Sequence, residues 1–115
     1  MDNKREIGKK FEDVAKEYLI NNGYEIIESN FSTRIGEIDI IAKNDEYLCF
    51  IEVKYRKSGS MVKGLYAVNK EKQRTIYNVA KVYMLAKKIK SDTACRFDVI
   101  SIDGEDITLI KNAFP

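Results

Sequence analysis

Two neighbouring apolar segments of this chain carry acidic side chains where a buried β-sheet is expected. Residues 36–42 read Gly-Glu-Ile-Asp-Ile-Ile-Ala, and the next apolar segment, 46–55, contains Glu52-Val53-Lys54. Burying an unpaired carboxylate costs several kcal/mol or raises its pKa until it takes up a proton. Acids repeated on two adjacent strands therefore indicate a site, and a hard divalent cation held by oxygen ligands suits it.

Strand periodicity predicts how these side chains are arranged. Because successive side chains point to opposite faces, Glu37, Asp39 and Ile41 are expected on one face of their strand. On the next strand Glu52 and Lys54 share a face, and a hairpin would bring Asp39 and Glu52 together. The alternative is a solvated hairpin whose charges form surface ion pairs, each worth less than about 1 kcal/mol. The nearly continuous apolar run around Asp39 favours a strand covered on both faces.

Composition indicates one globular domain over residues 1–115, with 44% hydrophobic and 33% charged residues. No apolar run approaches the ~20 residues of a membrane span, and the charged N-terminus is unlike a signal peptide. We therefore expect a cytoplasmic protein without a membrane partner, in which Cys49 and Cys95 are reduced.

The chain contains no histidine. This excludes Ser-His and Cys-His catalysis, and also zinc sites and general bases that depend on histidine. Any hydrolysis must then rest on carboxylates, lysine and metal-activated water.

Periodicity and turn residues predict seven elements in the order α-β-β-β-α-β-β. Helices are expected over residues 4–22 and 68–89, and strands over 24–31, 37–43, 46–55, 95–102 and 107–110. Two amphipathic helices with five strands predict an α/β fold in which a central mixed five-stranded sheet is flanked by two main helices. The parallel pair would be joined by the crossover that contains the second helix.

Positive charge is concentrated near the second helix, although the net charge is only +2. Between residues 56 and 74 we count six cations against the single acid Glu71: Arg56, Lys57, Lys63, Lys70, Lys72 and Arg74. A local basic surface beside an acidic strand pair is expected of a site that binds a phosphate backbone. The alternative is a solvated loop and helix start.

Three further polar positions have both a functional and a structural interpretation. Glu12 lies with Gly8 at the margin of the first helix's apolar stripe, where it could reach the sheet or pair with Lys16. Gln73 on the second helix could contact a scissile phosphate or lie on the helix surface. Arg96 and Asp98, two residues apart on a late strand, are expected to pair with each other.

The acidic hairpin resembles the core of PD-(D/E)XK nucleases. Asp39, followed after twelve residues by Glu52-Val53-Lys54, matches that motif, with Ile38 in place of the usual proline. Glu12 matches the helix glutamate of the superfamily, and Gln73 matches its accessory polar position.

Nearly the whole chain also resembles the YraN-like family of small bacterial proteins. The shared elements are Gly8, Glu12 and Ala15, Asn30-Phe31-x-x-Arg34-x-Gly36-Glu37-Ile38-Asp39, Phe50-Ile51-Glu52-Val53-Lys54-x-Arg56, Lys72-Gln73, Arg96-Phe97-Asp98-Val99 and Asn112-Ala113-Phe114. That family is placed among endonuclease-like folds similar to archaeal Holliday-junction resolvases. The resemblance therefore implies a restriction-endonuclease-like core, which by itself does not establish cleavage.

The resemblance also implies roles for individual residues. Asp39, Glu52 and the backbone carbonyl of Val53 would bind Mg²⁺ or Mn²⁺. Lys54 would position or activate the attacking water, and Glu12 would complete the acidic cluster directly or through water. Glu37 belongs to the YraN-like pattern, but the nuclease motif assigns it no role.

The expected function is that of a metal-dependent endonuclease acting on branched or otherwise structured DNA, and the pattern does not separate DNA from RNA. Nucleic-acid contacts are expected from Arg34, Arg56, Lys57, Lys72, Gln73 and Arg74. A resolvase that cuts two strands symmetrically would be a homodimer. The alternatives are a non-catalytic nucleic-acid-binding module and an interaction protein with the same fold.

Overall fold

The computed structural model describes residues 4–56 and 68–114. Its elements are α1 (Lys4–Asn21), β1 (Tyr24–Thr33), β2 (Gly36–Asn44), β3 (Tyr47–Arg56), α2 (Lys70–Ala86), β4 (Cys95–Asp103) and β5 (Asp106–Ile110). This confirms the expected order α-β-β-β-α-β-β. Helix α2 ends at Ala86, before the expected Ile89, because Lys88 adopts a left-handed conformation with φ of 56°.

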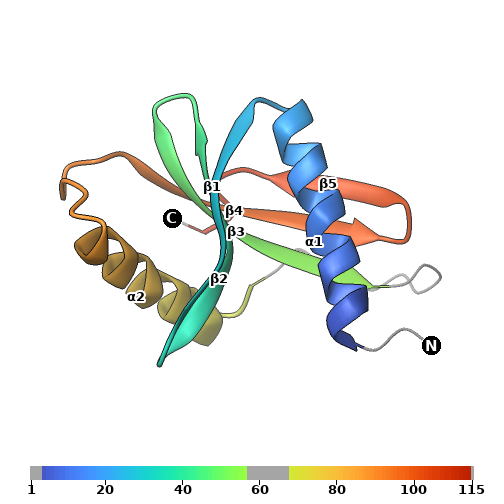
Figure 1. The fold of residues 1–115 in the computed structure, drawn as a ribbon, viewed down its shortest axis with the longest axis horizontal. Coiled ribbons are helices and arrows are strands. Elements are labelled where there is room, and N and C mark those ends of the chain that lie inside the picture. Colours follow the sequence, from blue (N-terminus) through green and yellow to red (C-terminus); the bar gives the residue numbers. More distant parts are fainter. Residues whose placement is uncertain (1–3, 57–67, 115) are drawn as a thin grey trace.

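The five strands form one mixed sheet in the order β1-β2-β3-β4-β5. Strands β3 and β4 are parallel, and the other neighbouring pairs are antiparallel. Figure 1 shows α1 and α2 packed on opposite sides of this sheet. None of the helices in the described part of the chain is long and apolar enough to cross a membrane.

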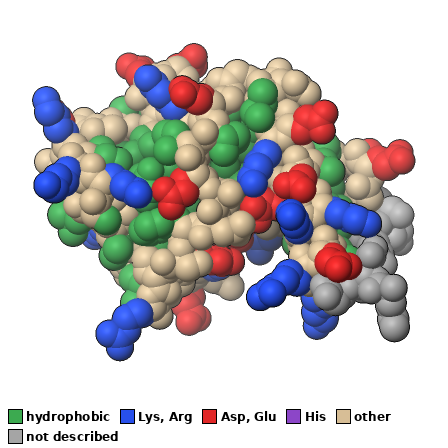
Figure 2. Space-filling model, viewed as in Figure 1, with side chains coloured by type: hydrophobic (Ala, Val, Ile, Leu, Met, Phe, Trp, Pro, Cys, Tyr) green, Lys and Arg blue, Asp and Glu red, His purple; other side chains and the backbone are tan. Residues whose placement is uncertain are grey.

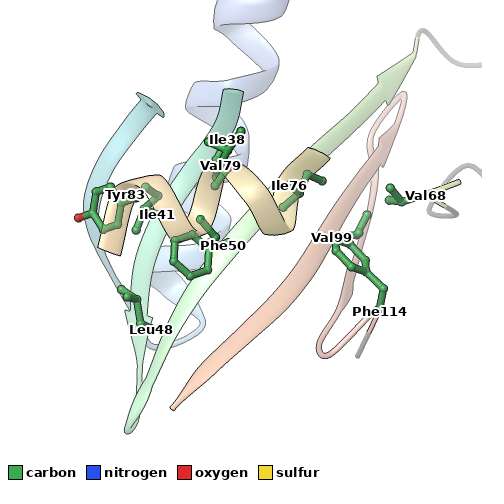
Figure 3. Close-up of a cluster of buried hydrophobic side chains, with 11 residues drawn as sticks. Ile38, Ile41, Leu48, Phe50, Val68, Ile76, Val79, Tyr83, Val99 and Phe114 are labelled. Carbon is green, nitrogen blue, oxygen red and sulfur yellow. The ribbon is translucent and has the colours of Figure 1, made fainter. Parts of the chain in front are cut away.

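Apolar side chains on both faces of the sheet explain why its central strands are so hydrophobic. Ile41 and Phe50, which are partners across the β2–β3 hairpin, lie in the cluster that α2 covers (Figure 3). Ile40 and Ile51 lie in the second cluster, against Leu19 of α1. The central strands are therefore covered on both faces, as their composition predicts.

The two cysteines are free, as expected. Cys49 is fully buried in the cluster beneath α1, whereas Cys95 is half-buried against the cluster beneath α2. Burial is the main reason that the pKa of the Cys49 thiol is raised to about 12, so this thiol is an inert core group.

Asp98 is fully buried, and its carboxylate lies at the centre of a polar network. It accepts hydrogen bonds from the Tyr24 hydroxyl (2.8 Å), the Arg96 guanidinium (2.9 Å) and the Asn112 N–H (2.9 Å). Arg96 also donates to the Asn44 side chain at 2.7 Å. The expected Arg96–Asp98 pair is confirmed, and it ties β4 to β1, β2 and the C-terminal segment.

Candidate functional site

The β2–β3 hairpin opens beside Asp39. Regular pairing between the two strands ends at Ile40 and Ile51, and Figure 1 shows the strands diverging beyond this point. If the register continued, Val53 would lie opposite Ile38. Instead the Val53 N–H donates to Oδ2 of Asp39 at 2.8 Å. The Asp39 carboxylate therefore replaces a backbone acceptor at the apex of the opening.

Strict alternation along β2, which the sequence predicts, is broken at Asp39, because Ile38 and Ile40 are two residues apart yet lie in clusters on opposite faces of the sheet. Ile38 and Ile41 both lie in the α2 cluster, while Ile40 lies in the α1 cluster and Asp39 lines a cavity beside α1. The neighbouring β1 residue, Asn30, has a left-handed φ of 55°, and regular β1–β2 pairing skips it. Ser29 pairs with Ile40 and Phe31 with Ile38, so Asn30 lies opposite Asp39 in the same register.

The structure brings Asp39 and Glu52 together, as predicted. Glu52 points toward α2, where Nζ of Lys72 lies 3.8 Å from its Oε2, and a side-chain hydrogen bond links Glu52 to Asp39. Burial, and then the charge of Asp39, raises the pKa of Glu52 to about 7. Burial also raises the pKa of Asp39, although the Val53 N–H opposes this rise. Near neutral pH the pair therefore retains a proton when no cation is present.

Lys54 follows Glu52 by two residues on β3 and projects to the same side of the strand. Its positive charge acts on the Glu52 carboxyl and favours the ionised form. Within residues 4–56 and 68–114, Lys54 forms no ion pair. It is therefore available to an anionic ligand in the opening.

Glu12 faces the same cavity as Asp39, which has a volume of about 760 Å³ and lies between α1 and strands β1 to β3. Its Oε1 accepts a hydrogen bond from the Asn30 side chain at 2.8 Å and lies 3.4 Å from Nζ of Lys16. Glu12 therefore forms the predicted i,i+4 pair with Lys16 and also lies beside the sheet. Glu37 lines this cavity too.

The oxygen donors at the opening fit a small divalent cation. Nowhere in the described ranges do three or more Asp, Glu, His or Cys side chains group into a metal site. Asp39 and Glu52 supply two carboxylates. The Val53 carbonyl points to the same edge of β3 as the Val53 N–H, which is the edge that faces the opening. Mg²⁺ commonly uses one or two carboxylates and completes its shell with water and phosphate oxygens, and Mn²⁺ accepts the same ligands.

Three of the residues expected to contact nucleic acid are placed where this would be possible. Arg34 is exposed in the turn between β1 and β2, and Arg74 is exposed on the first turns of α2. Lys72 lies in the first turn of α2, with its ammonium group near Glu52. All three remain candidates for phosphate contacts.

The other expected contacts have internal partners or cannot be placed. Arg56 donates to Asp103 at 2.9 Å, which ties the ends of β3 and β4 together. The Gln73 side chain donates to the Val68 carbonyl at 2.7 Å, so it stabilises the start of α2. Lys57 lies outside the described residues, as does the rest of the expected loop up to residue 65.

Sequence reasoning missed the basic side chains of α1. Lys4, Arg5, Lys9 and Lys16 all line the cavity that Asp39 faces. A helical wheel that places Gly8 and Glu12 next to the sheet also places Arg5, Lys9 and Lys16 along the same side. Extending that wheel toward the N-terminus would have found them.

Comparison with known proteins identifies the family. Residues 11–102 match the model described as "Uncharacterised protein family UPF0102". A UPF0102 protein of Lachnoclostridium phytofermentans is 45% identical over 112 residues, covering 97% of this chain and 95% of that protein. A relative in Clostridium kluyveri is 45% identical (96% and 94% covered), and one in Vibrio parahaemolyticus is 38% identical (96% and 93% covered). The chain therefore belongs to the UPF0102 family, the YraN family that its motifs resemble.

Proposed function

We propose that this protein is a metal-dependent endonuclease that hydrolyses phosphodiester bonds in branched or structured DNA. The observation that carries the proposal is the hydrogen-bonded pair of Asp39 and Glu52 where β2 and β3 diverge. Two partly buried carboxylates provide oxygen ligands for a cation, and Lys54, which forms no ion pair within the described residues, provides a positive group for a phosphate. The resemblance to PD-(D/E)XK nucleases agrees with this chemistry.

Each residue has a distinct part in the proposed reaction. Bound Mg²⁺ or Mn²⁺ would supply Lewis-acid chemistry, neutralising charge on the phosphate and lowering the pKa of water. Asp39, Glu52 and the Val53 carbonyl hold the cation, and the Val53 N–H fixes the orientation of the Asp39 carboxylate. Lys54 stabilises negative charge that develops on the phosphate and positions the attacking water. Glu12 completes the acidic cluster, either directly or through water.

The proton held by the acidic pair links activity to pH. A cation can bind fully only when Glu52 has lost its proton, and the pKa of that group is raised to about 7. Cation affinity and cleavage should therefore both rise as the pH increases through about 7. Lys72 balances the Glu52 charge when the cation is absent and becomes available to a phosphate when it is present.

The proposed setting is the cytoplasm, with cellular DNA as the substrate. Cutting both strands of a symmetric junction would require two copies of the chain acting together. Arg34, Lys72 and Arg74 would hold phosphates without reading base sequence.

The test compares cleavage of labelled four-way junction, flap and linear duplex DNA with Mg²⁺, Mn²⁺ or EDTA. Wild type should cut the branched substrates only with a metal, and Glu52→Gln and Lys54→Met should each lower the rate by roughly 100-fold or more. Matched controls are Glu46→Gln and Lys43→Met, which change exposed residues near the other end of the same hairpin. Both should cleave at the wild-type rate.

Two results would count against the proposal. Equal cleavage by wild type, Glu52→Gln and Lys54→Met would identify a contaminating nuclease. Binding of branched DNA without cleavage, whichever metal is present, would support a non-catalytic nucleic-acid-binding module.

A further inference from the structure

Helix α1 lines the cavity that contains Asp39 with a row of cations and with the acids Glu12 and Asp13. Four of its five basic residues line that cavity, namely Lys4, Arg5, Lys9 and Lys16. Lys16 is paired with Glu12, but Lys4, Arg5 and Lys9 are exposed and form no ion pair with any residue that the structure describes. Figure 2 shows basic side chains, interspersed with acidic ones, on the side of the molecule where α1 lies.

An aromatic side chain faces the same cavity. Tyr55 lines it and is 40% exposed. Its ring stacks on Phe11, with centroids 4.4 Å apart and planes 17° apart. Gly8 permits this packing, because a Cβ there would lie only 3.1 Å from the Tyr55 hydroxyl oxygen. Tyr55, on β3, is thus packed against α1 and presents an accessible aromatic surface to the cavity.

Cations and an accessible aromatic ring in one cavity are the features that recognise unpaired nucleic acid. A single strand offers phosphates to the cations and the face of a base to the ring. In a continuous duplex the bases are already stacked on their neighbours, so the ring would have no partner. A cavity of about 760 Å³ is also within the size range of sites that enclose small ligands.

We propose that the cavity beside α1 binds an unpaired strand, with Lys4, Arg5 and Lys9 on its phosphates and one base stacked on Tyr55. The inference rests on the proposed endonuclease function and narrows its substrate to branched nucleic acid with a single-stranded arm. Asp39 lines the same cavity, so a strand held there leads directly to the acidic pair. The α2 cations Lys72 and Arg74 would then meet the remaining, paired arm.

Binding can be tested without cleavage by working in EDTA. Fluorescence anisotropy would compare a labelled short oligothymidylate with a duplex of the same length. One variant combines Lys4→Gln, Arg5→Gln and Lys9→Gln. The control makes the same charge change at exposed lysines outside the cavity, combining Lys43→Gln, Lys81→Gln and Lys90→Gln.

We expect wild type to bind the single strand more tightly than the duplex. The α1 variant should lose at least about tenfold in affinity. The slope of log affinity against log salt concentration should also become less steep by about 2, because three contacts to single-strand phosphates are lost. The control variant should stay within about twofold to threefold of wild type. Equal losses in the two variants, or equal affinity of wild type for single strand and duplex, would overturn the proposal.

Stacking of a base on residue 55 can be measured separately by fluorescence. The chain contains no tryptophan, so Tyr55→Trp introduces a single reporter. The single strand should quench its fluorescence and the duplex should not, whereas absence of quenching by a bound single strand would exclude the stacked base. Because no step here requires hydrolysis, binding without cleavage would reject only the endonuclease function. Cleavage without single-strand preference would reject only this inference.

Discussion

Glu52 illustrates how one buried carboxyl links stability to proton binding and, in the proposed function, to cation binding. Its side chain is only 12% exposed and lies beside Asp39, and burial dominates the rise in its pKa. The ionised form is thus unfavourable in the folded chain unless a positive charge lies close by. Lys72 and Lys54 supply part of that charge, and a divalent cation would supply more.

The first prediction concerns stability in EDTA as a function of pH. Because the folded state raises the Glu52 pKa from 4.5 to about 7, it binds more protons than the unfolded state between these values. The stabilisation is therefore complete below pH 4.5 and is lost as the pH rises through about 7. Glu52→Gln should be more stable than wild type at pH 8, by about 1–3 kcal/mol, and not at pH 4.

Urea unfolding at both pH values measures this difference. The exposed variant Glu46→Gln should follow wild type at both. Parallel pH dependences for wild type and Glu52→Gln would show that Glu52 ionises normally in the folded chain.

The second prediction concerns the buried network around Asp98. Asp98→Asn removes the negative charge that balances Arg96, whose side chain is only 11% exposed. An uncompensated buried charge destabilises a fold by roughly 3–5 kcal/mol, and we expect a loss of this size in urea unfolding. Asp106→Asn, at an exposed position, should change stability by less than about 0.5 kcal/mol. A small loss in Asp98→Asn would mean that water reaches Arg96.

At the scale of elements, the position of the site depends on where the pairing between β2 and β3 ends. Strands β2 and β3 pair regularly from their turn as far as Ile40 and Ile51, and then separate at Asp39. The N-terminal part of α1 borders the cavity that Asp39 faces, and the first turn of α2 reaches Glu52 through Lys72. The acidic pair therefore has basic helix residues on both sides of the sheet.

The third prediction concerns the contact between β2 and α2. Gly36 has a φ of 155°, and a Cβ there would lie 2.6 Å from Cγ2 of Thr75. Gly36→Ala should destabilise the fold by about 1–3 kcal/mol, because the added Cβ forces either the Thr75 side chain or α2 to shift. Adding Thr75→Ser removes the Cγ2 atom and should recover part of the loss. If Thr75→Ser recovers nothing in urea unfolding, the loss arises from the backbone conformation alone.

The elements could be predicted from the sequence because periodicity and turn residues determine them. The 3.6-residue spacing of apolar side chains marked both helices, and turn residues such as Asn44-Asp45 marked the strand ends. The pairing of Asp39 with Glu52 followed from the hairpin. The break in alternation between Ile38 and Ile40 could not be predicted, because both residues are apolar and suit either face of a sheet that is covered on both sides.

Side-chain partners were harder to predict for a similar reason. Arg56 belongs to a basic stretch in the sequence, yet it pairs with Asp103, which the parallel register places opposite it. Gln73 bonds a carbonyl at the start of its own helix. Such contacts depend on distant residues or on local backbone geometry, neither of which the spacing of charges reveals.

At the scale of the whole molecule, two apolar clusters hold a five-stranded sheet between two helices, and the site lies where the sheet opens between them. The clusters contain the residues that make β2 and β3 rigid, including Ile40, Ile41, Phe50 and Ile51. Strands anchored by buried side chains on both faces hold Asp39 and Glu52 close together before a ligand binds. We propose that this opening binds a divalent cation.

Calorimetric titration with Mn²⁺ tests that claim most directly, because it requires neither substrate nor cleavage. Wild type should bind Mn²⁺ with an affinity that rises between pH 6 and pH 8, following the pKa of about 7 at Glu52. Asp39→Asn and Glu52→Gln should each weaken binding by at least about tenfold, while Glu46→Gln should not. Binding by wild type that is no tighter than binding by the combined Asp39→Asn and Glu52→Gln variant would rule out a cation site at this opening.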